Sequence, residues 1–74
     1  MESRKLMDKL DRYRLARGWS MSRMSIELCI PEGRCNRNLS GTHTPRDFNV
    51  REYRVYYEAN QDEIEDVLLT AATS

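Results

Sequence analysis

Side chains that can form several hydrogen bonds are concentrated just after Pro31. The forked guanidinium of Arg37 matches O6 and N7 of guanine, and the amide of Asn36 matches N6 and N7 of adenine. The carboxylate of Glu32 can accept a hydrogen bond from N4 of cytosine. These residue types are typical of a segment that reads base edges in double-stranded DNA.

The sequence around these residues predicts a helix-turn-helix that would present them. Ser20 can cap a helix that must end near Cys29, because Pro31 disfavours the helical conformation at the residue before it. Pro31 suits the first turn of the next helix, which extends to Gly41. The predicted segment has about eight residues of helix, a short turn and about nine more helical residues, which is the size of a helix-turn-helix. The second helix of this motif enters the major groove. On that second helix the residues expected to face the bases are Glu32, Gly33, Asn36 and Arg37. Arg34 lies one position off this face, so we expect it to contact phosphate first and a base second.

A helix is predicted before the motif, over residues 3–17. Leu6, Leu10 and Tyr13 recur at helical spacing, Ser3 can serve as the N-cap, and Gly18 follows as a C-terminal glycine.

Two more helices are predicted after the motif. Asp47 or Asn49 can cap the first of them, which ends at Asn60, and Asp62 can cap a last helix of about eight residues. The sequence shows no alternation of the kind that indicates strands. We therefore expect an all-α, compact five-helix domain over residues 1–74, with its helix-turn-helix at about 20–41 and an acidic C-terminal helix at about 62–72.

The stretch "YRLARGWSMSRMSIEL", followed by "CIPEGRCNRNLSGTHTP", resembles the helix-turn-helix family of lambda repressor and Cro, also called the Xre family, over roughly residues 6–68. The matching positions are Arg14, Gly18, Ser20, Met24, Ser25, Leu28, Ile30 and Gly41. Cys29 departs from the family pattern where a turn glycine is usual, and Asn38 departs where an apolar residue usually packs. The resemblance implies a DNA-binding domain of four or five helices. It also implies phosphate contacts from the start of the second helix and from the loop after the third, here Ser20, Met21, Ser40, Thr42 and His43.

Charge is unevenly distributed along a chain whose formal net charge is zero. All 12 lysines and arginines lie in residues 1–54 with seven acidic residues, so this part carries +5, and the five acidic residues of 55–74 give −5. A basic body with an acidic tail can still present a basic face to DNA.

An apolar stripe on the last predicted helix indicates a second copy of the chain. Ile64, Val67 and Leu68 share one face of a helix too short to be stable alone. A palindromic operator has half-sites ~34 Å apart, so two copies joined through this stripe, with Tyr56 and Tyr57, would match its symmetry. The acidic residues expected to face solvent are Glu63, Glu65 and Asp66.

These features predict a sequence-specific DNA-binding transcriptional regulator, encoded by a phage or mobile element, that represses transcription as a cytoplasmic homodimer. The alternative is an antitoxin or phage-encoded inhibitor on the same scaffold, which would bind a protein partner through its acidic C-terminal segment.

Other classes have little support in the sequence. Cys29, Cys35 and His43 do not have the spacing of a zinc site and lack a fourth ligand, so we expect no metal and no cofactor. We find no catalytic motif, and no apolar run approaches the ~20 residues that cross a bilayer.

Overall fold

The computed structural model describes residues 2–41 and 50–73, and within them the chain forms five α-helices and no strands. The helices are α1 (Ser3–Arg17), α2 (Met21–Leu28), α3 (Glu32–Leu39), α4 (Arg51–Ala59) and α5 (Gln61–Thr73). The prediction of an all-α, five-helix domain is confirmed.

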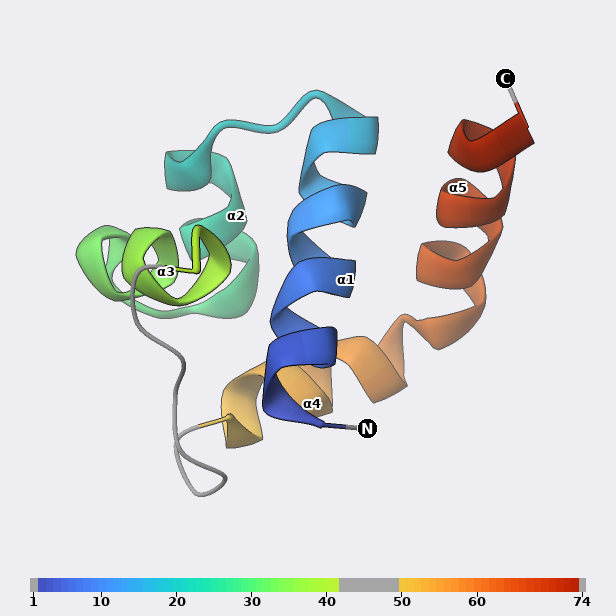
Figure 1. The fold of residues 1–74 in the computed structure, drawn as a ribbon. Helices are drawn as coiled ribbons and strands as arrows, with labels where there is room; N and C mark the ends of the chain where they lie inside the picture. The colour runs from blue at the N-terminus through green and yellow to red at the C-terminus, as the bar shows by residue number, and fades with distance from the viewer. Residues whose placement is uncertain (1, 42–49, 74) are drawn as a thin grey trace.

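Helix α1 is the centre of the arrangement and packs against α3, α4 and α5 (Figure 1). The pair α2 and α3 lies on one side of α1, α5 lies on the other side, and α4 crosses near the N-terminal end of α1. The acidic α5 is therefore separated from α3 by the central helix.

The core is built from apolar residues at the helical spacing seen in the sequence. Leu6, Leu10 and Tyr13 of α1 are all buried, as their spacing predicts. The other buried apolar residues come from α1 itself, from every remaining helix and from Val50: they are Met7, Met24, Leu28, Cys35, Leu39, Val50, Tyr53, Tyr57 and Ile64. Even α5, the last helix, contributes to the single core.

The structure confirms two of the three residues predicted to end or begin α1 and α2. Ser20 caps α2 as predicted, because its Oγ accepts a hydrogen bond from the backbone N–H of Arg23 at 3.1 Å. Gly18 ends α1 in the left-handed conformation with φ of 71°. The prediction for Ser3 is wrong: Glu2 occupies the N-cap position, and Ser3 is the buried first residue of the helix.

Helix α5 begins at Gln61 and has 13 residues, close to the predicted range of about 62–72 but longer than the predicted eight residues. The predicted cap is wrong, because Asp62 lies within the first turn of the helix. It starts early because Asn60 already takes part in helical bonding: its carbonyl accepts from the Ile64 N–H at 2.9 Å. Before α4 the described residue is Val50, and the predicted caps Asp47 and Asn49 lie outside the described residues.

Candidate DNA-binding surface

The turn between α2 and α3 is closed by Cys29 in a left-handed conformation, with φ of 59°. Its N–H donates to the carbonyl of Ile26 at 3.2 Å, and the N–H of Ile30 donates to Ser25 at 3.1 Å. These are the bonds that a C-terminal glycine usually permits. Cys29 therefore adopts the left-handed conformation that favours glycine, and Pro31 then takes the N-cap position of α3.

The inner side of α3 is fixed to the rest of the domain by Cys35, Asn38 and Leu39, all buried. The Asn38 amide donates a hydrogen bond to the Tyr53 hydroxyl of α4 at 2.7 Å. Asn38 therefore packs inward in place of an apolar residue because Tyr53 satisfies its amide. The Cys35 thiol lies 3.6 Å from the Met21 sulfur, and burial raises the pKa of this thiol to about 11.

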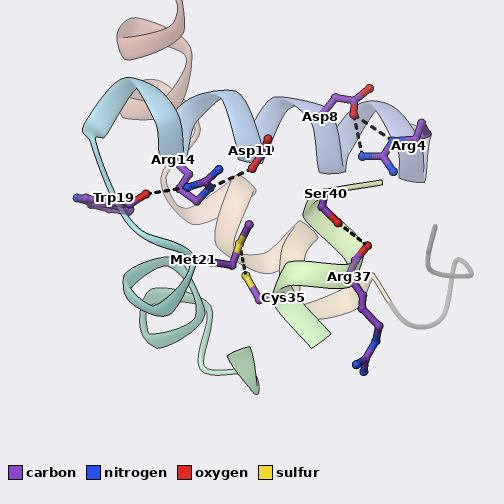
Figure 2. A network of polar contacts seen from close by, with 9 residues as sticks. All are labelled: Arg4, Asp8, Asp11, Arg14, Trp19, Met21, Cys35, Arg37 and Ser40. Carbon is purple, nitrogen blue, oxygen red and sulfur yellow. Dashed lines mark hydrogen bonds and ion pairs between the residues drawn. The ribbon is translucent and has the colours of Figure 1, made fainter. Parts of the chain in front are cut away.

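The outer side of α3 carries all four residues predicted to read bases. Glu32, Gly33, Asn36 and Arg37 are exposed. Figure 2 shows the Arg37 side chain pointing away from α1. Two turns of one helix thus present an amide, a guanidinium and a carboxylate to the surroundings.

Arg34 lies at the edge of this surface and is held by Glu52 of α4. Its two terminal nitrogens contact the two carboxylate oxygens of Glu52, each at 3.3 Å. The pKa of Glu52 is lowered, first by a hydrogen bond from its own backbone and then by Arg34. Arg34 can reach a phosphate only in competition with this carboxylate, which the sequence did not indicate.

The residues predicted to contact phosphate fall into three groups. Ser20 and Ser40 are exposed, although the Ser20 hydroxyl also caps α2. The Met21 side chain is half-buried against the core, which leaves only its backbone for a phosphate. Thr42 and His43 lie outside the described residues.

The junction between α1 and α2 depends on Arg14, whose role was not predicted beyond its place in the family pattern. Its Nε donates to Asp11 at 3.0 Å, and its Nη1 donates to the carbonyl of Trp19 at 2.9 Å (Figure 2). The guanidinium groups of Arg17 and Arg23 lie over the Trp19 ring, at 5.1 and 4.8 Å from its centroid. These contacts fix the position at which α2 begins.

The predicted dimer interface requires a correction. Ile64 is completely buried in its own chain and Tyr57 nearly so, because α5 is needed to close the core. Neither side chain has surface for a second copy. Tyr56, Val67 and Leu68 are partly buried against the same core.

Two acidic residues of α5 that were expected to face solvent are paired with α1, although Glu63 is exposed and Glu65 is half-buried. Glu65 lies 2.7 Å from Lys9, and Glu63 lies 3.3 Å from Arg17. The Tyr57 hydroxyl also donates to Glu65, at 2.6 Å. Asp66, the third acidic residue of this face, is exposed, as is Glu63.

Within residues 2–41 and 50–73, no three histidine, cysteine or acidic side chains are grouped to hold a metal ion. No helix in this part of the chain has the length and apolar character needed to cross a membrane. No protein-family model, curated protein or solved structure matches the chain.

Proposed function

We propose that the chain is a sequence-specific DNA-binding regulator of transcription that inserts α3 into the major groove. The observation that carries this proposal is the two-sided character of α3. Its inner side is anchored by Asn38 and Cys35, and its outer side exposes Glu32, Asn36 and Arg37. A major groove is wide enough for one α-helix, and these are residue types that discriminate base pairs.

The remaining elements have supporting roles in this proposal. Helix α2 crosses the DNA backbone, with Ser20 and the backbone of Met21 next to phosphate. Arg37 binds guanine, Asn36 adenine and Glu32 cytosine. Repression would follow from occlusion of polymerase at an operator.

The placement of charge supports the same orientation. The acidic residues of 55–74 repel phosphate, and α5, which carries most of them, lies across α1 from α3 (Figure 1). Glu63 and Glu65 are moreover partly neutralised by Arg17 and Lys9. The surface around α3 therefore differs in charge from the chain as a whole, whose net charge is zero.

A homodimer on a palindromic operator remains part of the proposal, with a revised interface. Val67 and Leu68 are only partly buried, and Leu69 is 65 % exposed on α5. We assign the contact with a second copy to these residues instead of Ile64 and Tyr57. The two-fold symmetry of such a pair would match two half-sites.

The test is selection of preferred duplexes from a random pool, followed by binding of single-position variants. Arg37→Ala should relax preference at one base pair and cost about 1–3 kcal/mol on the preferred site. Lys5→Ala is the control, since Lys5 is an exposed basic residue of α1 that belongs neither to the reading face nor to the assigned dimer contact. Unchanged preference for Arg37→Ala would contradict the assigned reading face.

The second candidate is a protein-binding module that acts through α5. It is favoured by the exposed Leu69 and by Asp66 on the same helix. If the wild type binds no duplex in the selection, this candidate replaces the first.

A further inference from the structure

Gly33 occupies an unusual place for a glycine, in the first turn of an eight-residue helix on its exposed side. Glycine is the least favourable helix residue after proline, because it loses the most backbone freedom. The presence of a glycine in so short a helix therefore calls for a structural or functional explanation.

The backbone does not provide that reason. Gly18 and Gly41 have positive φ values of 71° and 87°, which favour glycine, whereas Gly33 has ordinary helical geometry. At Gly33 an alanine would introduce no backbone strain.

Packing within the chain does not provide the reason either. A Cβ atom added to Gly33 would meet only Nη1 of Arg37, at 3.5 Å. This is an ordinary van der Waals distance, and the contact is to the movable end of a long side chain. The space above Gly33 is thus open to solvent on one side and bordered by the Arg37 guanidinium on the other.

We propose that Gly33 is a clearance position, whose missing side chain lets the backbone of α3 approach the edge of a base pair next to the one read by Arg37. The inference rests on the proposed function, because it assumes that the occupant of this space is duplex DNA. It assigns Gly33 an effect on specificity through shape, whereas Asn36 and Arg37 act through hydrogen bonds.

The deciding experiment compares the stability and DNA affinity of Gly33→Ala. Its melting temperature should rise by a few degrees, because alanine is the better helix residue and the domain is small. Its affinity for the preferred duplex should fall at least tenfold. Gln61→Ala, a substitution at an exposed helical site of α5 away from Val67, Leu68 and Leu69, is the control and should leave affinity unchanged.

A second comparison separates clearance from a shift of Arg37. In an Arg37→Ala background, Gly33→Ala should still weaken binding, and loss of its effect there would overturn the inference. Unchanged affinity of the single variant would also overturn it and leave DNA binding standing. A lower melting temperature would show that the fold itself requires Gly33, and this result would also overturn the inference. Absence of duplex binding by the wild type would overturn the inference and the proposed function together.

Discussion

At the scale of single residues, Asn38 shows how one polar side chain fixes the orientation of α3. Its amide and the Tyr53 hydroxyl satisfy each other inside the core, and both side chains are buried. Removing one partner leaves a buried polar group without a hydrogen bond, which costs about 1–3 kcal/mol.

We expect Asn38→Ala to lower the free energy of unfolding by about 1–3 kcal/mol, because it leaves the buried Tyr53 hydroxyl without its hydrogen-bond partner. The double variant Asn38→Leu/Tyr53→Phe, which removes both polar groups, should recover most of this loss. Chemical denaturation of the three proteins measures the difference. Equal destabilisation of the single and double variants would show that the hydrogen bond is not the cause.

The two cysteines should react very differently, although they are six positions apart in sequence. Cys29 is exposed at the turn, and Cys35 is buried with its pKa raised to about 11. A thiol reagent at pH 8 should therefore modify one thiol in the native protein and the second only after unfolding. Rapid modification of both would show that α3 opens readily from the core.

At the scale of elements, the ion pair between Arg34 and Glu52 connects the first turns of α3 and α4. We expect Glu52→Gln to strengthen DNA binding, because Arg34 is released for phosphate and an acidic charge is removed. The slope of log affinity against log salt should steepen by about 0.9 if one phosphate contact is gained. Glu58→Gln removes an equal charge from an exposed site of α4 and should not steepen the slope. Identical slopes for wild type and Glu52→Gln would place Arg34 away from the DNA.

The contact of α5 with α1 should depend on pH through Glu65. Hydrogen bonds from Lys9 and then Tyr57 lower the pKa of Glu65, and the bond to Glu65 raises the pKa of Lys9. A lowered carboxyl pKa stabilises the fold above the unfolded pKa of about 4.3, and this contribution is lost as pH falls through the folded value. Glu65→Gln should thus cost up to about 1 kcal/mol at pH 7, since the pair is partly exposed, and almost nothing once the pH lies below the lowered pKa of Glu65. Thermal melts across pH compare the two proteins, and a difference that persists in acid would rule out the carboxylate charge as its source.

Prediction from sequence was most successful for elements that depend on local signals. Ser20, Gly18 and Pro31 mark helix ends through bonding or backbone preferences that involve only nearby residues. The exposed face of α3 also follows from helical spacing alone. The pairing of Arg34 with Glu52 and the burial of Ile64 depend on how separate helices meet, so spacing within one helix did not reveal them.

At the scale of the whole molecule, α5 belongs to the core, which changes how the proposed dimer should be tested. Deletion of residues 61–74 would remove Ile64 from the core and unfold the domain, so loss of binding would be uninformative. A substitution on the exposed part of α5 avoids this difficulty.

We expect Leu69→Asp to convert a dimer to a monomer while changing stability by less than about 0.5 kcal/mol, because Leu69 is largely exposed. Val55→Asp, at a similarly exposed site on α4, is the control and should leave the dimer intact. Analytical ultracentrifugation gives the oligomeric state. A wild type that is monomeric at tens of micromolar and yet binds its operator tightly would exclude the dimer, without affecting the assignment of α3.

The fluorescence of Trp19 can report on the surroundings of the start of α2. It is the single tryptophan of the chain, and the Arg23 guanidinium lies 4.8 Å from its ring centroid. A phosphate that drew Arg23 away would remove a positive charge from the face of the excited ring and shift its emission. The tryptophan emission of the unlabelled protein can therefore be used to follow DNA binding at α2, the helix that is proposed to cross the DNA backbone.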